Sequence, residues 1–559
     1  MRDVARSIGM TSRPLRARPS LARHALGAAA VLLLVPTAPA PAAIAAPIPQ
    51  KKAPARAKPA APKSSAPGLP AIEGGTAVID KQAVTDAPAR ALYAKTGWHA
   101  LWSAGNAAAL DRILADRARH GLDRVAFLPE QESGVSGGSA AADEDIARTR
   151  AALDYAAALA QGRVDPATLH DVYTLPRPKV DLVAGLARAL AANALPAWFD
   201  GLAPQDADYA ALSAAYIAFS AKAAVASPTI AIPSGVIRVG MRDPRVATIV
   251  EQLVESGYTI AAPDIAAPPP PGQTAAPTLY TQALADAVKG LQTDYGIAAD
   301  GVVGPDTLKV LNLGAGDRAR SLAVGLERRR WLARTAPATR IDVNTASAQL
   351  RYYRDGVLVD QRKVIVGEPG RETPGLSSPI YRLVANPTWT VPKSIQNGEM
   401  ANVGPDYLAE HNMVLRDGWI VQQPGPSNAL GLVKFDMAND QAIYLHDTSA
   451  PGLFDRSQRH LSHGCVRVED ASGFAQMLAD DAGVADAWQT AQMSGEMTFV
   501  PLPTRIPVRL LYHNVYVGDD GRVAFRTDPY GWNDPVAERL GFARAAANRA
   551  EAKAIDIGP

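Results

Sequence analysis

The stretch SHGCVR, residues 462–467, holds the only cysteine of the 559-residue chain, and the stretch YLHDT, residues 444–448, precedes it. His446 stands 19 residues before Cys465, and His463 stands two residues before it. An unassisted thiol, with a pKa of about 8.5, is mostly protonated at neutral pH and is a poor nucleophile. A nearby imidazole can take that proton and leave an ion pair. The pattern therefore predicts a nucleophilic Cys465 served by His446 or His463.

The residues around these three side chains fit the same chemistry. The apolar run 443–445 predicts a strand that aims His446, and Asp447 or a backbone carbonyl would orient the second ring nitrogen. Gly464 would let the backbone approach a substrate closely. We expect the amide groups of Gly464 and Cys465 to hold a developing oxyanion, which is worth roughly 3 kcal/mol per donor.

Three other interpretations of the same residues stay open. A free cysteine is often an inert, buried small side chain. Alternatively, His446, His460, His463 and Cys465 could hold a metal ion, although their spacing matches no familiar zinc pattern. The chain could also be a cysteine peptidase of another family, but the papain-type signature C-G-[SA]-C-[WY] is absent.

The region around the cysteine is rich in predicted strands, beginning near Arg340. Apolar runs between Asp/Gly and Gly/Pro turns predict strands at 341–344, 349–353, 361–366, 418–422, 431–437, 442–445, 496–500 and 508–516. A helical pattern follows the cysteine at 470–478. This region is long enough for its own core.

Several stretches here resemble the L,D-transpeptidase (YkuD) catalytic domain. They are SHGCVR with the preceding HDT, NPTWTVPKSI at 386–395, QPGPSNALGLVKF at 423–435 and GRVAFRTDPYG at 521–531. Together with a helical N-terminal half, they resemble the large YcbB-type branch from Gram-negative envelopes, over about residues 72–533. The resemblance implies a lid-like subdomain at about 395–431.

By matching positions, the resemblance assigns roles to individual residues. Cys465 would be the nucleophile, His446 the general base, and His463 would shape the site or its oxyanion pocket. The residues that would line the acyl pocket or the substrate cleft are Ser462, Gly464, Arg467, Trp389 and Tyr444. Arg467 suits a structural ion pair nearly as well as a substrate carboxylate.

The family reaction implied is acyl transfer between peptidoglycan stem peptides. Cys465 would attack the L-D bond of a tetrapeptide and release D-alanine, and a diaminopimelate amine would take the acyl group in a 3→3 cross-link. No metal or cofactor is required, and carbapenems would acylate the cysteine. The alternatives are an L,D-carboxypeptidase or endopeptidase that uses water, and an inert peptidoglycan-binding adaptor. Partners would be the stem peptides and glycan-polymerising wall enzymes.

A second segment, residues 236–318, predicts a small helical module. Its stretch LQTDYGIAADGVVGPDTLKVLN, 291–312, resembles a peptidoglycan-binding domain. We expect Asp243 to cap a first helix that ends at Gly257, and Pro305 to begin the last helix. A helical spacer without glycan binding is the alternative, and a Pro-rich insertion interrupts the module at 268–271.

The helical first half and the strand-rich second half together predict an α+β multidomain fold. Residues 71–235 form a helical, alanine-rich scaffold, with helices expected at 107–118, 146–161 and 182–192 and a stop at Gly121. Trp98, His99 and Trp102 are expected in a core or interface. The β-rich catalytic domain would span 337–515, followed by a C-terminal segment, 516–559.

The N-terminus predicts export. Residues 1–46 read as a signal peptide, with arginines, a short apolar run and A-x-A sites, and an uncleaved inner-membrane anchor is the alternative. Residues 47–70 read as a disordered Pro/Ala/Lys linker. Each of these segments carries a net charge of +5, so the remainder carries −8. An acidic folded part makes a nucleic-acid surface unexpected, and we predict a periplasmic protein.

Overall fold

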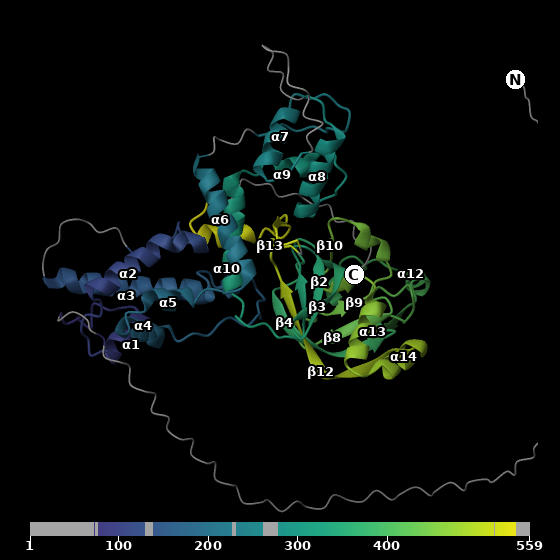
Figure 1. The fold of residues 1–559 in the computed structure, drawn as a ribbon. Coiled ribbons are helices and arrows are strands. Elements are labelled where there is room, and N and C mark those ends of the chain that lie inside the picture. Colours follow the sequence, from purple (N-terminus) through teal and green to yellow (C-terminus); the bar gives the residue numbers. More distant parts are fainter. Residues whose placement is uncertain are drawn as a thin grey trace, which may run out of the picture. The chain divides into compact units, whose positions relative to one another are not determined.

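The computed structural model describes residues 72, 77–128, 138–225, 231–260, 278–518 and 520–543. The predicted signal peptide, linker, Pro-rich insertion and final residues of the C-terminal segment lie outside this part. Helices fill the first half and a large sheet fills the second, so the predicted α+β class is confirmed (Figure 1). In the described part, no helix is long and apolar enough to cross a membrane.

The scaffold region is a cluster of helices with short caps. The side chains of Asp86, Ser103 and Asp181 each accept a hydrogen bond from the first turn of a helix, which satisfies amides that have no partner within the helix. Gly121, at φ +66°, follows a 3-10 turn after α2, as its predicted stop requires. The helices are α1 (Ala87–Lys95), α2 (Ala104–Ala115), α3 (Gly138–Gln161), α4 (Leu182–Ala191), α5 (Leu195–Asp200) and α6 (Ala207–Val225).

The small module contains α7 (Val246–Glu255), α8 (Gln282–Tyr295) and α9 (Pro305–Leu311). The prediction that Asp243 caps α7 is wrong, because the helix begins three residues later. The Asp243 carboxylate instead binds the guanidinium of Arg245 at 2.7 Å. Pro305 begins α9 as predicted.

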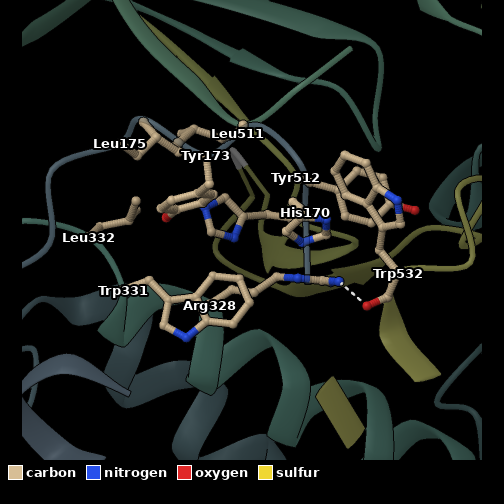
Figure 2. A pocket seen from close by; sticks show the side chains of 11 residues that line it. His170, Tyr173, Leu175, Arg328, Trp331, Leu332, Leu511, Tyr512 and Trp532 are labelled. Carbon is tan, nitrogen blue, oxygen red and sulfur yellow. Dashed lines mark hydrogen bonds between the residues drawn. The ribbon is translucent and has the colours of Figure 1, made fainter. Parts of the chain in front are cut away.

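The long helix α10 (Ala315–Arg330) links the module to the sheet domain. It packs along α6, and one contiguous apolar core includes scaffold, module and C-terminal residues such as Leu110, Leu291, Leu322 and Val515. Figure 2 shows an aromatic pocket in this region, in which Arg328 of α10 lies near His170 and Trp532. The Arg328 guanidinium donates to the Trp532 carbonyl at 2.8 Å. This pocket does not include Cys465, His446 or His463.

The second half is built on a nine-stranded mixed sheet in the order β10-β3-β11-β9-β8-β4-β12-β1-β2. Helices α13 (Ala471–Asp481) and α14 (Ala485–Met493) supply Phe474 and Trp488 to the core beneath it. The strands are β1 (Arg340–Asn344), β2 (Gln349–Arg354), β3 (Val357–Gly367), β4 (Leu376–Ala385), β8 (Val433–Met437), β9 (Leu445–His446), β10 (His460–Ser462), β11 (Val466–Val468) and β12 (Thr498–Leu511).

Two strand predictions need correction. The runs at 496–500 and 508–516 are largely one long strand, β12, with an irregular pairing between Pro501 and Ile506. The run at 442–445 is a strand only at its end, in β9, because Ala442 has a φ of +55° and breaks the extended backbone.

A subdomain projects from the sheet domain at about residues 389–430, close to the predicted lid. It contains a three-stranded sheet of β5 (Trp389–Thr390), β7 (Trp419–Gln422) and β6 (Met413–Arg416), with helices α11 (Lys393–Asn397) and α12 (Pro405–Glu410). Its own small core includes Trp389, Ile395 and Met400. We call residues 389–430 the lid subdomain. The C-terminal segment adds β13 (Val515–Val517), β14 (Val523–Phe525) and α15 (Asn533–Arg539).

Candidate active site

The register of three central strands brings the motif residues together. Strand β9 pairs in parallel with β11, which sets His446 beside Arg467, and antiparallel with β8, which sets His446 beside Lys434. The neighbouring residues Leu445 and Val466 are in the apolar core. Because side chains alternate along a strand, His446, Arg467 and Lys434 share the opposite face of the sheet.

Cys465 lies at the edge of that face, directly before β11. Its side chain is half-buried, and the sulfur lies 3.7 Å from the Ala442 carbonyl, to which the thiol donates. Burial raises the pKa of the Cys465 thiol, and hydrogen bonds from the backbone and side chain of Tyr444 oppose this rise, as do Lys434 and Arg467. The resting thiol is therefore protonated at neutral pH.

His446 is fully buried beside Tyr444. The two rings meet edge to face with their centroids 5.5 Å apart. Burial, followed by the nearby charges of Arg467 and Lys434, lowers the pKa of His446 to about 3. Within the described chain, neither ring nitrogen has a hydrogen-bond partner of normal geometry. The imidazole of His446 is therefore neutral at neutral pH.

The carboxylate of Asp447, one of two predicted orienting groups for His446, serves another purpose. It accepts a 2.9 Å hydrogen bond from the Leu432 amide, at the end of the chain segment that returns from the lid subdomain. Gly431 passes so close to this carboxylate that a β-carbon there would lie 2.3 Å from its oxygen. Asp447 thus anchors the base of the lid subdomain.

His463 points to a different partner from His446. Its Nε2 lies 2.9 Å from Oε1 of Glu399, in the lid subdomain, and Arg371 donates to the same oxygen at 2.7 Å. Burial would raise the pKa of Glu399, but the hydrogen bonds from His463 and Arg371 outweigh it and lower that pKa. The two predicted histidines are thus in separate settings, one on the sheet and one against the lid subdomain.

Hydrogen bonds brace residues 462–465, the loop that carries Cys465, the predicted nucleophile; we call this segment the nucleophile loop. The fully buried Ser462 donates its hydroxyl to the Cys465 carbonyl at 2.5 Å and accepts from the Gly464 amide at 3.2 Å. Gly464 has a φ of +112°, which favours glycine. The Thr373 hydroxyl donates to the Gly464 carbonyl at 2.8 Å. Since Ser462 engages the Gly464 amide, the Cys465 amide is the remaining candidate of the two predicted oxyanion donors.

A groove of about 270 Å³ runs beside Tyr444. The residues predicted to wall the substrate cleft, Trp389 and Tyr444, both line it. Lys434 lies over the Tyr444 ring, 4.2 Å from its centroid, and forms a 2.8 Å ion pair with Asp436. The groove therefore combines aromatic walls with charged groups, and Tyr444, whose side chain interacts with Cys465, connects it to the thiol.

The alternative metal set of His446, His460, His463 and Cys465 does not assemble. His460 Nε2 lies 2.9 Å from the Thr345 carbonyl, and its ring packs edge-on against Tyr530. Among the described residues there is no group of three or more His, Cys, Asp or Glu side chains arranged to hold a metal ion.

Sequence reasoning missed Glu399, Arg371, Thr373 and Lys434. Arg371 and Thr373 follow the turn-forming stretch GEPG at residues 367–370. A charged residue and a hydroxyl directly after such a turn were the available signal. Glu399 had no local signal, because its partner His463 is 64 residues away.

Comparison with known families gives three matches. Residues 338–492 match the L,D-transpeptidase catalytic domain, residues 87–215 match a scaffold domain, and residues 242–311 match a family described as "Putative peptidoglycan binding domain". A protein of Haemophilus influenzae named "Putative L,D-transpeptidase" is 35% identical over 220 residues, which cover 35% of this chain and 45% of that protein. The chain thus matches a little under half of that relative's length.

Among solved structures, an L,D-transpeptidase from Stackebrandtia nassauensis aligns with 15% identity and a TM-score of 0.22, over 51% of this chain and 97% of that one. One from Xylanimonas cellulosilytica aligns with 17% identity and a TM-score of 0.18, over 51% of this chain and 100% of that one.

Proposed function

We propose that the protein cross-links peptidoglycan, with Cys465 as the nucleophile, through residues 338–492, which match the L,D-transpeptidase catalytic domain. The observation that carries this proposal is the shared sheet face of His446 and Arg467 next to Cys465. There the resting pair is a neutral thiol and a neutral imidazole, rather than the ion pair expected from the motif alone, because burial raises the pKa of Cys465 and lowers that of His446.

In the first step, the Cys465 sulfur attacks the carbonyl carbon of the L-D amide bond in a tetrapeptide stem. The thiol proton moves to His446 as the sulfur–carbon bond forms, so a thiolate need not accumulate beforehand. The carbon–nitrogen bond then breaks, and His446 returns the proton to the departing amine of D-alanine. Arg467 and Lys434 would stabilise negative charge as it develops on this sheet face.

In the second step, the amine of a diaminopimelate side chain on another stem attacks the thioester. His446 takes a proton from this amine, the carbon–sulfur bond breaks, and the thiol is restored. The product is a 3→3 cross-link. If water attacks instead, the product is a tripeptide, and the protein is a carboxypeptidase.

The groove lined by Trp389 and Tyr444 would hold a stem peptide. Its aromatic walls suit the alkyl parts of the stem. Lys434 and Arg382 suit the carboxylates of the stem, and Asp436, with which both pair, suits its amine. The domain at 242–311 supports peptidoglycan as the substrate. We further propose that the protein acts in the periplasm, and that glycan-polymerising enzymes supply its substrate.

Muropeptide analysis tests the proposal. Full-length wild type, Cys465→Ala and Cys465→Ser are incubated with a disaccharide tetrapeptide, and the products are identified by mass spectrometry. We expect a 3→3 dimer and free D-alanine from the wild type, and neither from Cys465→Ala. Cys465→Ser keeps the shape of the side chain but is a far weaker nucleophile, and it controls for folding.

Each other outcome has a definite meaning. Dimer formation by Cys465→Ala would remove Cys465 from the mechanism. Tripeptide without dimer from the wild type would favour hydrolysis. The absence of any product, together with the absence of a Cys465 adduct after carbapenem treatment, would favour the inert adaptor.

A further inference from the structure

The carboxylate of Glu399 is the point where the lid subdomain meets the nucleophile loop. Its Oε1 accepts hydrogen bonds from His463 at 2.9 Å and from Arg371 at 2.7 Å. The next residue, Met400, is buried in the core of the lid subdomain. Glu399 is therefore tied to the lid subdomain through its backbone and to the nucleophile loop through its side chain.

The two donors to Glu399 come from segments that hold Cys465 in place. His463 is two residues from Cys465. Arg371 lies in the loop that also supplies Thr373, whose hydroxyl holds the Gly464 carbonyl. A shift of the Glu399 carboxylate would therefore disturb both His463, within the nucleophile loop, and the 371–373 segment that braces it.

The lid subdomain also meets the site at Tyr444. Tyr444, whose side chain interacts with Cys465, packs against the core of the lid subdomain. Glu399 and Tyr444 thus link this subdomain to the surroundings of Cys465 at two separate contacts. A change in the position of the lid subdomain would therefore change the surroundings of Cys465.

The two contacts differ in strength. The Glu399 side chain is 42% exposed and that of Arg371 is 45% exposed. Exposed ion pairs of this kind add little to folding, because water screens them. The weak Glu399 contact can therefore favour one position of the lid subdomain without fixing it there. The apolar packing of Tyr444, in contrast, is continuous with the subdomain core.

We propose that Glu399 is a positioning residue that seats the lid subdomain against the Cys465 loop. The Glu399 contact to His463 and Arg371 forms when the lid subdomain is down over the thiol and breaks when it lifts to admit a stem peptide. The inference rests on the proposed function for its purpose, since seating would keep water from the thioester.

The test exploits the single cysteine of the chain. Alkylation of the full-length protein by a maleimide reports on Cys465 alone. Rates are measured with a small maleimide and with a bulky one, and their ratio is compared between variants. A change in the reactivity of the thiol affects both reagents equally and cancels in the ratio. The ratio therefore reports only on steric access to Cys465. Glu410→Ala is the matched control, because Glu410 is an exposed glutamate at the end of α12 in the same subdomain.

We expect Glu399→Ala to raise the bulky-to-small ratio by about 3- to 5-fold, the range that an exposed pair can supply. Glu399→Gln keeps an acceptor oxygen without the charge and should lie between Glu399→Ala and wild type. Glu410→Ala should match wild type. A ratio in Glu399→Ala equal to that of wild type would overturn the inference.

Failure of the proposed function leaves a different signature. Alkylation needs no acyl transfer, so a protein that forms no cross-link can still show the shift in the maleimide ratio. Such a result would sink the transpeptidase proposal and leave the seating role of Glu399 standing.

Discussion

His446 and Arg467 are register partners on adjacent parallel strands, and both are almost fully buried. Burial is the main cause that lowers the pKa of His446, and the guanidinium of Arg467 is the second cause. Burial and this neighbouring cation keep His446 neutral at rest, and the same two effects oppose the imidazolium that would form when it takes a proton. Position is what favours His446 over His463 as the candidate general base, because His446 shares the sheet face that Cys465 borders, whereas His463 contacts Glu399.

The first prediction separates the two histidines. His446→Gln should lower the rate of Cys465 acylation by about 10²- to 10⁴-fold, the usual contribution of a general base. His463→Gln should lower it less, because His463 contacts Glu399 rather than the sheet face. Intact-mass measurement of acylation by a tetrapeptide stem gives both rates. An equal or larger loss in His463→Gln would reverse the assignment.

The second prediction concerns acid stability. Burial is the main cause that lowers the pKa of His120 and His446 to about 3 and that of His460 to about 4. An unfolded histidine has a pKa near 6.5, so between pH 6.5 and these values the unfolded chain binds protons that the folded chain does not. Each such histidine should therefore reduce the free energy of unfolding by about 1.4 kcal/mol per pH unit as pH falls.

Urea unfolding between pH 7 and pH 4.5 measures this slope. His120→Gln should reduce the slope of unfolding free energy against pH by about 1.4 kcal/mol per pH unit, which corresponds to one proton. His99→Gln, at an exposed histidine, is the control and should leave it unchanged. If the slopes of His120→Gln and wild type coincide, His120 is not buried in the neutral form.

Local patterns predicted a large part of this structure. The SHGC stretch, the strand pattern near Arg340 and the Pro305 helix start depend on neighbours within a few residues, so the sequence carries them directly. The partners of these residues are distant in the chain. Glu399 reaches His463 across 64 residues, and Tyr530 reaches Gly367 across 163. Nothing in a short window indicates such pairs.

Short-range reasoning also failed where a side chain had two possible uses. Asp243 stands where a helix cap is expected, but its carboxylate makes a stronger, bidentate contact with Arg245, and the helix begins after both residues. Asp447 is next to the predicted base, but its carboxylate accepts from Leu432 instead. Only the folded arrangement decides between such competing partners.

The third prediction tests support from the C-terminal segment. The Tyr530 hydroxyl donates to the Gly367 carbonyl at 2.7 Å and accepts from the Thr373 amide at 3.4 Å, and Thr373 in turn holds Gly464. Tyr530→Phe leaves buried polar groups unsatisfied, which costs about 1–3 kcal/mol. We expect slower acylation of Cys465 as the nucleophile loop loosens.

The control for that experiment is Tyr381→Phe, at a tyrosine in β4 outside this network. Acylation kinetics and thermal unfolding are measured for both variants. If Tyr530→Phe acylates as fast as Tyr381→Phe, the C-terminal segment does not support the nucleophile loop.

The last prediction concerns the ion pair of Glu327 and Arg330 in α10. Both side chains are fully buried and lie 2.7 Å apart. Glu327 also accepts from the Val164 amide and the Trp331 ring, and Arg330 donates to the His120 carbonyl and the Tyr209 hydroxyl. The pair thus joins the long helix to the scaffold helices.

Removing one partner leaves an uncompensated buried charge, so Glu327→Leu and Arg330→Met should each lower the free energy of unfolding by about 3–5 kcal/mol. The double variant should lose much less than the sum, because two apolar side chains of similar volume replace the pair. Arg329→Met is the control, since Arg329 pairs with Asp206 at the surface and should cost under about 1 kcal/mol. Urea unfolding of all four variants gives the coupling energy. Additive losses would mean that Glu327 and Arg330 stabilise the scaffold independently, through their separate hydrogen bonds.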